Sequence, residues 1–358
     1  MTGTSMDALD VALCRIEGIG LNLRATLVEA SSWPLRDLSV FFRRASEQLP
    51  VTARDLARAS HDLAMLHLEA LQEISRGRRL DLICVHGQTI YHAPPLSWQL
   101  IQPTLIAHNL NVPVVYDLRA ADLARGGQGA PITPLADFIL FRKEGERRCI
   151  INLGGFCNHT LIPGRSGAAP GQDELLHWKL RVSGGDICSC NHLLDRIARD
   201  LLGRPYDAEG SAAAGGKTLK EPLEELTKLL LNQSVGKRSL GTGDELGDWI
   251  NKYRHEYAPQ DLARIACAAI ASVITRPVPA ERLILAGGGT KNITLLKEIR
   301  SRSKKLVSSS DEFDIPPLSR EAMAMAVLGA LCQDRIPITL GQVTGSFNPP
   351  VAGTWIIP

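Results

Sequence analysis

The stretch from Arg148 to Ile162 reads RCIINLGGFCNHTLI. Apolar residues on both sides of the Gly154-Gly155 turn are typical of two strands joined by a tight connection. The opening of the chain repeats this design, because a hydroxyl-rich turn at residues 2–7 precedes an apolar run at residues 11–16. Two such turns, each leading its own α/β segment, predict a duplicated fold with a phosphate-binding turn in each half.

The strand expected before the opening turn is not found, because the chain begins inside that turn. We interpret this as either a shortened chain or the lack of an edge strand. The alternative is that the Ser and Thr residues of this segment only keep a flexible N-terminus soluble.

The composition indicates an ordinary globular protein of two domains. The chain has 358 residues, of which 44% are apolar and 22% charged, with a formal net charge of +2. This balance predicts no nucleic-acid or membrane partner, and no apolar run approaches the roughly 20 residues of a membrane span. Charges at Asp7, Asp10 and Arg15 interrupt any signal peptide. Eight scattered cysteines favour reduced thiols, so we expect a cytoplasmic location.

An acid stands out in the stretch at residues 184–191, GGDICSCN, which precedes a helical segment at residues 192–198. Small residues allow close backbone approach, and the first amides of a helix favour a negative group. A carboxylate at Asp186 could therefore act as a general base toward a bound hydroxyl or water. The alternative is that Asp186 is only the N-cap of the helix.

Other polar groups follow predicted strands. A buried strand at residues 80–85 delivers His86, Gln88 and Thr89 to its carboxyl end, where ligands bind in open α/β sheets. Arg119 could bind a carboxylate through two hydrogen bonds, and a glycine cluster follows at residues 126–131. A structural role for His86 and a surface ion pair between Asp117 and Arg119 remain the alternatives.

A third glycine turn follows a predicted strand at residues 282–286. Gly287-Gly288-Gly289 then leads into a helix at residues 293–300, an order that suits a ribose or phosphate close to the backbone. Further helices are predicted at residues 38–76, 218–232, 262–273 and 318–331. Polar loops are predicted at residues 162–174 and 300–310, and the tail at residues 343–357 is expected to return to the first domain.

Taken together, these motifs resemble the 1,6-anhydro-N-acetylmuramic acid kinase family over nearly the whole chain. That family opens with Ser-Gly-Thr-Ser-x-Asp-Gly, which this chain carries at residues 2–8. Its His-Gly-Gln-Thr motif stands at residues 86–89, and its Asp-Phe-Arg stretch and Gly-Gly-Gln-Gly-Ala-Pro appear at residues 117–119 and 126–131. Its Asn-Ile-Gly-Gly-x-x-Asn turn matches residues 152–158.

The family's triple glycine on the adenosine side matches Gly287 to Gly289 with Asn292. Its catalytic Asp lies in Phe-Asp-Thr-Gly-Pro-Gly-Asn, which places the base at Asp186 and the final Asn at Asn191. Between them, Thr-Gly-Pro-Gly is replaced by Ile187 to Cys190.

The resemblance implies a two-domain actin/hexokinase/Hsp70-like ATPase fold, α/β, with duplicated ribonuclease-H-like halves and a cleft between the domains. It implies an N-terminal domain of residues 1–122 plus 338–358 and a C-terminal, nucleotide-side domain of residues 123–337. ATP and Mg²⁺ are the implied cofactors, with Asp7 ordering the metal's water ligands. The implied cofactor-binding residues are Gly3, Thr4, Ser5, Asp7, Asn152, Gly154, Gly155, Asn158, Gly287, Gly288, Gly289 and Asn292. The implied substrate residues are His86, Gln88, Arg119 and Asp122.

The family reaction is an ATP-dependent opening of the anhydro sugar, in which O6 receives the phosphoryl group. Two other functions stay open at this point: a kinase for another 1,6-anhydro sugar, and an ATP- or sugar-binding protein without turnover. The second is motivated by the altered residues next to Asp186. The family also implies a homodimer as one form of assembly.

Overall fold

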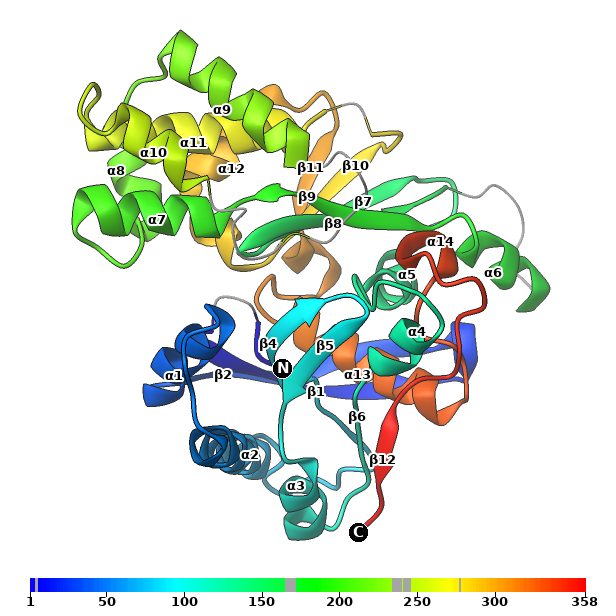
Figure 1. Ribbon diagram of the computed structural model, residues 1–358. Helices are drawn as coiled ribbons and strands as arrows, with labels where there is room; N and C mark the ends of the chain where they lie inside the picture. Colours follow the sequence, from blue (N-terminus) through cyan, green and yellow to red (C-terminus); the bar gives the residue numbers. More distant parts are fainter. Residues whose placement is uncertain (4–5, 165–171, 234–239, 241–245, 277) are drawn as a thin grey trace. The chain divides into compact units, whose positions relative to one another are not determined.

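The computed structural model describes residues 1–3, 6–164, 172–233, 240, 246–276 and 278–358 (Figure 1). Thr4 and Ser5, two of the expected phosphate-binding residues, lie outside this part of the chain. Contacts divide the chain into two α/β units. Unit 1 comprises Met1–Arg142, Ser166–Ser183 and Asp314–Pro358, and unit 2 comprises Lys143–Arg165 and Gly184–Phe313.

A five-stranded sheet forms the centre of unit 2, in the order β11-β10-β7-β8-β9. Strand β7 pairs antiparallel with β8 and parallel with β10, which pairs parallel with β11. This is the strand order of a ribonuclease-H-like half, and it confirms the predicted actin/hexokinase/Hsp70-like fold class. The strands are β7 Arg148–Leu153, β8 Phe156–Ile162, β9 Ser183–Ser189, β10 Arg282–Ala286 and β11 Leu306–Ser309.

The polar loop predicted at residues 300–310 is wrong in part, because β11 occupies its second half. Only two of the four β11 residues carry apolar side chains, and Leu306 is exposed. The strand forms because it lies parallel to β10 at the sheet edge, from Arg282 opposite Leu306 to Leu285 opposite Ser309. Pairing with a buried neighbour therefore outweighs the weak apolar pattern.

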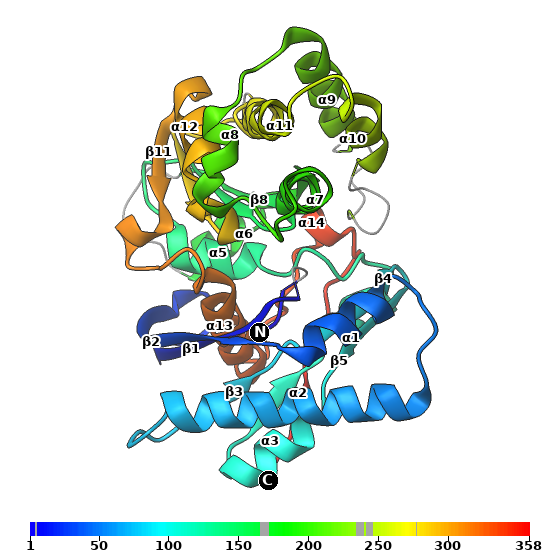
Figure 2. The ribbon, with the colours of Figure 1, turned by 90° about the vertical axis from the view of Figure 1, so that its left-hand side faces the viewer.

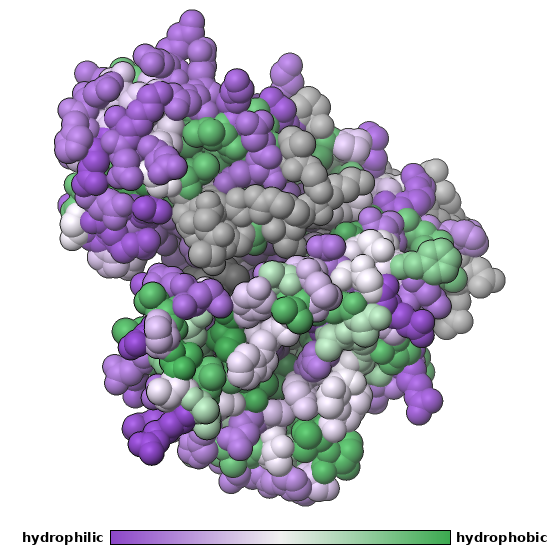
Figure 3. All heavy atoms as spheres, viewed as in Figure 1, coloured by the Kyte–Doolittle hydropathy of each residue, from purple (hydrophilic) through white to green (hydrophobic). Residues whose placement is uncertain are grey.

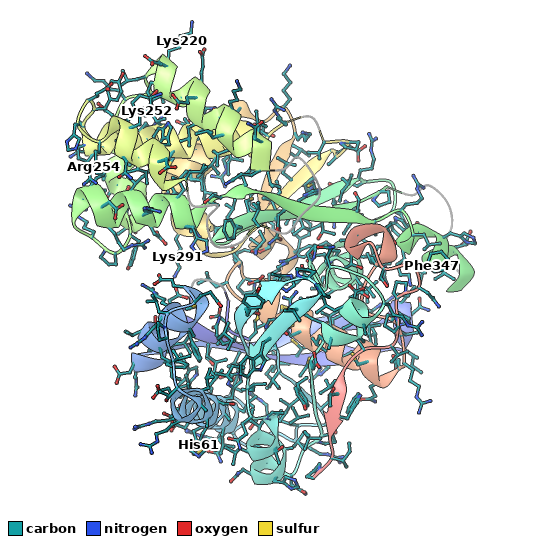
Figure 4. The ribbon with its side chains drawn as sticks, viewed as in Figure 1. His61, Lys220, Lys252, Arg254, Lys291 and Phe347 are labelled. Atoms are coloured by element: carbon teal, nitrogen blue, oxygen red, sulfur yellow. The ribbon has the colours of Figure 1, made fainter. Side chains whose placement is uncertain are left out.

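The helices of unit 2 pack around α11, whose alanine-rich sequence is buried along nearly its whole length (Figure 2). Small side chains let α7, α8, α9 and α12 approach it closely. Figure 3 shows a mostly hydrophilic surface over α9 and α10, and Lys220, Lys252 and Arg254 point outward there in Figure 4. The helices are α7 Asn191–Leu202, α8 Ser211–Gly215, α9 Lys220–Gln233, α10 Gly247–Tyr253, α11 Pro259–Ile274 and α12 Ile293–Arg302, with short 3-10 turns at Ala208–Gly210, Gly288–Lys291 and Ser310–Phe313.

The described strands of unit 1 form three separate sheets. Strand β1 pairs antiparallel with β2, β3 pairs parallel with β6, and β4 forms a hairpin with β5. The C-terminal strand β12 pairs antiparallel with β6, so the tail returns to the first unit as predicted. Thr2 forms an antiparallel bridge with Leu9 of β1. The strands are β1 Ala8–Glu17, β2 Arg24–Pro34, β3 Ile83–Cys84, β4 Gln88–Ala93, β5 Leu96–Leu100, β6 Val114–Tyr116 and β12 Thr354–Ile356.

The helices of unit 1 bury their apolar faces against these strands. The longest, α2, begins with a capping box in which the Thr52 and Asp55 side chains each accept a hydrogen bond from the other residue's backbone amide. Among the described residues, no helix is long and apolar enough to cross a membrane. The helices are α1 Asp37–Ser46, α2 Ala53–Ile74, α3 Pro103–Leu110, α4 Ala120–Ala124, α5 Pro134–Phe141, α6 Gln172–Lys179, α13 Arg320–Gln333 and α14 Gly341–Thr344, with a 3-10 turn at Gly20–Asn22.

These units differ from the domain boundaries expected at residues 122 and 338. The first boundary falls after Arg142 and the return begins at Asp314, and α6 also joins unit 1. Helices α5 and α13 pack on each other and on β2 and β1, which explains the shift. The Arg320 Nε of α13 donates to Asp137 Oδ1 of α5 at 2.8 Å, and both side chains are almost fully buried.

Glu146 binds three cations at the start of β7. Its carboxylate lies 3.0 Å from Arg148 Nη2 and 3.2 Å from Lys143 Nζ, and it accepts a hydrogen bond from Arg282 of β10. Burial alone would raise the pKa of this carboxyl, but hydrogen bonds from Arg282, Arg148 and Lys143 lower the pKa to about 2. The contacts therefore stabilise the folded state only while Glu146 is ionised.

We expect Glu146→Gln to remove part of the acid sensitivity of folding. The folded pKa lies below the ordinary value of 4.5, so the stabilisation is full above pH 4.5 and is lost as the pH falls toward about 2. Urea unfolding at pH 6 and at pH 3 measures the difference. In the variant, the free energy of unfolding should change less between the two pH values. An equal change in variant and wild type would contradict this.

Candidate active site

Two glycine turns of unit 2 lie next to each other. Strands β7 and β10 are parallel neighbours, with Ala286 opposite Asn152, so both turns follow the same edge of the sheet. Gly154-Gly155 leaves β7, and Gly287 to Gly289 leaves β10. The carboxyl edge of a parallel pair is where α/β sheets bind nucleotides and other ligands.

Three of these glycines have no room for a side chain. A Cβ at Gly155 would lie 2.3 Å from His192 Nε2, and one at Gly289 would lie 2.7 Å from Leu153 Cβ. Gly287 adopts φ +87°, and a Cβ there would lie 2.5 Å from Asn152 Oδ1. Gly288 differs, because it is exposed and a Cβ there would meet only Asn191 Nδ2, at 3.7 Å. The backbone at Gly288 is thus accessible from solvent, and nucleotide binding there stays a prediction.

The start of α7 fixes the first of these turns. The backbone amides of Cys190 and Asn191 donate to the carbonyls of Gly155 and Gly154 at 2.9 and 3.0 Å. Asn191 also donates through Nδ2 to the Leu153 carbonyl at 3.1 Å. Asn191 therefore holds the turn between β7 and β8.

The other two asparagines have different surroundings. Asn292 caps α12, because its Oδ1 accepts from the Leu295 amide at 2.9 Å. Asn158 pairs with Asn152 across β7 and β8 and is half-buried. Lys291, at the end of the triple-glycine turn, is exposed (Figure 4).

Asp186 lies inside strand β9 and not in a turn at the mouth of a helix. The interpretation of Asp186 as an N-cap is wrong, because α7 begins at Asn191 and its N-cap is Cys190. Pairing with β8 extends the strand through the small residues, and the Gly185 carbonyl accepts a hydrogen bond from His159 Nδ1 at 3.0 Å. Asp186 Oδ2 accepts from the Leu240 amide at 2.7 Å, and its side chain is half-buried.

Three of the substrate residues expected in unit 1 are connected by hydrogen bonds: His86, Arg119 and, through Gly129, Asp122. Arg119 donates from Nε to His86 Nε2 at 3.0 Å and from Nη1 to the Gly129 carbonyl at 2.6 Å. Since His86 Nε2 accepts, the ring proton resides on Nδ1, which lies 3.0 Å from the Gly87 carbonyl. Burial, and then the charge of Arg119, lower the pKa of His86 to about 3, so the ring stays neutral.

Gln88 is fully buried at the start of β4. Its Nε2 donates to the carbonyls of Thr89 at 3.1 Å and of Gly3 at 3.4 Å. Its Oε1 is buried and has no hydrogen-bond partner among the residues that the structure describes. A buried acceptor without a partner is costly, so Oε1 is suited to a ligand hydroxyl or N–H group.

The remaining expected residues of unit 1 are Gly3, Asp7 and Asp122. The Gly3 carbonyl accepts a hydrogen bond from the Met6 amide, and the exposed Asp7 accepts from the Ala8 amide at 3.0 Å. Asp122 is completely buried, and hydrogen bonds reach both of its oxygens. This burial favours a role in holding the site together over direct contact with a sugar.

The sequence reasoning missed a polar row on the β4–β5 hairpin. Gln99 Nε2 donates to Thr89 Oγ1 at 3.3 Å and to Ser97 Oγ at 2.9 Å, and Ser97 Oγ lies 2.8 Å from His92 Nδ1. Burial, and then the charge of Arg119, lower the pKa of His92 to about 4. The alternation of apolar and polar residues from Leu96 to Leu100 is the signal that could have identified a strand with one polar face.

We expect Gly288→Ala to change ATP binding and Gly287→Ala to change stability. Gly288→Ala leaves the fold intact because its Cβ meets only ordinary contacts, but the methyl group occupies the side open to a nucleotide, so the KM for ATP should rise. Gly287→Ala is strained and should lower the melting temperature, at a cost of roughly 1–3 kcal/mol. Thermal unfolding and ATP titration separate the two effects. An unchanged ATP titration in Gly288→Ala would exclude close nucleotide contact there.

Comparison with known proteins identifies the family. The family model described as "Anhydro-N-acetylmuramic acid kinase" matches residues 1–357. A relative of that name from Prochlorococcus marinus (strain MIT 9303) is 31% identical, with 99% of this chain and 97% of the relative covered. A second, from Bacillus cereus (strain Q1), is 28% identical, with 100% and 98% covered.

A search of solved structures finds a ROK family glucokinase from Streptomyces griseus in complex with glucose and AMPPNP. It has a TM-score of 0.38 and 15% identity, with 89% of this chain and 99% of that chain covered. The sequence matches, which span almost the full length of this chain and of its relatives, show that the chain belongs to the anhydro-N-acetylmuramic acid kinase family and is a phosphotransferase.

Proposed function

We propose that the chain uses ATP to open 1,6-anhydro-N-acetylmuramic acid with water and to phosphorylate O6, giving N-acetylmuramic acid 6-phosphate and ADP. Family membership supports the sugar named. The observation that carries the chemistry is the placement, within unit 2, of two adjacent glycine turns and a half-buried Asp186 on the same sheet. A kinase needs a phosphate cradle, and a hydrolytic ring opening needs a base.

In the proposed reaction, Asp186 takes a proton from water while the water oxygen bonds to the anomeric carbon. The bond from that carbon to O6 breaks, and O6 bonds to the γ-phosphorus as ADP leaves. The sum is sugar, water and ATP to sugar 6-phosphate, ADP and one proton. The hydrogen bond from the Leu240 amide keeps the Asp186 carboxylate oriented.

The glycine turns of unit 2 would hold the nucleotide through backbone contacts. Gly288 is the glycine of these turns whose backbone is exposed to a ligand. Mg²⁺ would neutralise phosphate charge in such a reaction, and the exposed carboxylate of Asp7 is suited to bind its water ligands. The part of the structure that is described contains no cluster of three or more metal-ligating side chains, which is consistent with a metal held mainly by phosphates and water.

The cluster in unit 1 would bind the sugar. The guanidinium of Arg119 is suited to the lactyl carboxylate of a muramic acid, because a planar fork matches a carboxylate. The buried Oε1 of Gln88 would accept from a hydroxyl or from the acetamido N–H. Because the pKa of His86 is lowered to about 3, its ring accepts a hydrogen bond from Arg119 without adding a charge of its own.

ADP release in the presence of ATP, Mg²⁺ and the anhydro sugar tests the proposal, with mass spectrometry of the sugar product. We expect release that depends on 1,6-anhydro-N-acetylmuramic acid and a product heavier by one water and one phosphoryl group. Equal turnover of 1,6-anhydroglucose, unaffected by Arg119→Ala, would instead indicate a kinase for another anhydro sugar. Nucleotide binding without release with either sugar would indicate a binding protein.

A further inference from the structure

We propose that Asp122 and Thr344 are positioning residues that hold Arg119 in the orientation needed to bind the substrate carboxylate. This inference rests on the proposed function, because it assigns Arg119 to that carboxylate. It departs from the expectation that Asp122 itself contacts the sugar. The sequence does not predict a role for Thr344, because it lies in the C-terminal tail, 222 residues from Asp122. The structure places its hydroxyl on the Asp122 carboxylate.

Both oxygens of the Asp122 carboxylate accept hydrogen bonds from residues of unit 1. Its Oδ2 accepts from the Gly129 amide at 2.8 Å, and its Oδ1 accepts from Thr344 Oγ1 at 2.8 Å. The side chain is completely buried, and a Cβ on Gly127 would lie 2.1 Å from Oδ2. The carboxylate is therefore shielded from a ligand by the loop it holds.

Gly129 connects this carboxylate to Arg119. Its amide donates to Asp122, and its carbonyl accepts from Arg119 Nη1 at 2.6 Å. Gly129 has φ +64°, and a Cβ there would lie 2.9 Å from Leu123 Cγ, so the loop conformation is closely constrained. Any shift of the Gly129 peptide moves the acceptor that fixes the guanidinium.

Thr344 contacts both Asp122 and the loop at residues 126–131. Besides its hydroxyl contact with Asp122, its carbonyl accepts from the Gln128 amide at 2.8 Å. Thr344 ends α14, which is anchored in turn where Gln342 Nε2 donates to the carbonyls of Lys179 and Val182. Through Thr344, the C-terminal segment thus fixes the position of the loop that contains Gly129.

The consequence for Arg119 follows from its geometry. Nε is fixed by His86 and Nη1 by Gly129, so the plane of the guanidinium is set by two acceptors on different segments. Bidentate binding of a carboxylate depends on that plane. Loss of the Thr344 hydroxyl would leave a buried carboxylate oxygen without its partner and allow the loop to move.

Thr344→Val and Thr344→Ser test the role of the hydroxyl, since valine matches threonine in shape and serine keeps the hydroxyl. We expect Thr344→Val to raise the KM for 1,6-anhydro-N-acetylmuramic acid about tenfold, as for a displaced binding group. The KM for 1,6-anhydro-N-acetylglucosamine, which lacks the carboxylate, should change little. Thr344→Ser should behave like the wild type with both sugars.

A double-mutant cycle separates positioning from general damage. Thr344→Val should add nothing in an Arg119→Ala background, because the group it positions is gone. Thr133→Val is the matched control, since Thr133 is a buried threonine of unit 1 that accepts from Arg320 Nη2 at 3.2 Å. This variant should lose stability without changing the preference between the two sugars. Additive effects of Thr344→Val and Arg119→Ala would overturn the proposal.

A measurement without catalysis keeps this result distinct from a failure of the proposed function. The Nε–H of Arg119, assigned by its loss in Arg119→Lys, should exchange with solvent faster in Thr344→Val than in wild type or Thr344→Ser. Unchanged exchange would overturn the positioning role. If the wild type turns over neither sugar but exchange accelerates as expected, the positioning role stands and the proposed reaction fails.

Discussion

Replacing Asp186 with Asn is expected to lower kcat by about 10²- to 10⁴-fold, the contribution typical of a general base. The amide keeps the shape of the carboxylate and an oxygen that can accept from the Leu240 amide, but it cannot take a proton from water. Binding of ATP should be unchanged. Single-turnover kinetics and nucleotide titration of the same preparation measure the two quantities.

Asp200→Asn is the matched control for this variant. Asp200 lies near the end of α7, about one-third exposed, with its Oδ2 3.4 Å from Arg196 Nε. Such surface pairs contribute little, so both kcat and stability should stay near the wild-type values. A kcat of Asp186→Asn close to that of Asp200→Asn would remove Asp186 from the reaction.

The second large effect is expected in the core of unit 1, where Asp137→Ala should lower the free energy of unfolding by about 3–5 kcal/mol. Arg320 would keep its charge at a site that is 1% exposed, and the Thr133 hydroxyl would be its one remaining hydrogen-bond acceptor among the described residues. Urea unfolding followed by tryptophan fluorescence is suited to this test. The Trp178 ring packs edge-on against Phe138, next to the substituted residue, at 5.3 Å between centroids.

The double variant Asp137→Leu with Arg320→Met serves as the counterpart, since it removes both charges and keeps apolar volume. It should be more stable than Asp137→Ala. Arg58→Ala, which breaks an exposed pair with Asp62, should change stability by less than about 1 kcal/mol. If Asp137→Ala were as mild as Arg58→Ala, the buried pair would not be a main support of α5 and α13.

Much of the fold could be predicted from sequence because its signals are local. The helical periodicity of α2, the alanine-rich α11 and the glycine turn between β7 and β8 are confirmed near their expected positions. Strands β9 and β11 were missed because pairing with neighbouring strands, and not their own residue types, makes them strands. The unit boundaries differ because α5 and α13 bind across a separation of 183 residues.

The candidate site was predictable to the level of residue types. The motif matches predicted His86 and Arg119 as site residues, and in the structure Arg119 Nε donates a hydrogen bond to His86 Nε2. The surroundings of Asp122 could not be predicted, because one of its partners lies 222 residues away. The sequence contains no local pattern that relates a buried carboxylate to a threonine at the far end of the chain.

The neutral His86 has a consequence for how this enzyme responds to acid. A histidine that accepts a hydrogen bond from an arginine is an uncharged acceptor, and with its pKa at about 3 His86 stays neutral from pH 5 to pH 8. The hydrogen bond from Arg119 Nε to His86 Nε2 is therefore independent of mild acidification. Loss of activity between pH 5 and 7 would have to originate elsewhere, in the catalytic acid–base chemistry or in the phosphates of the nucleotide.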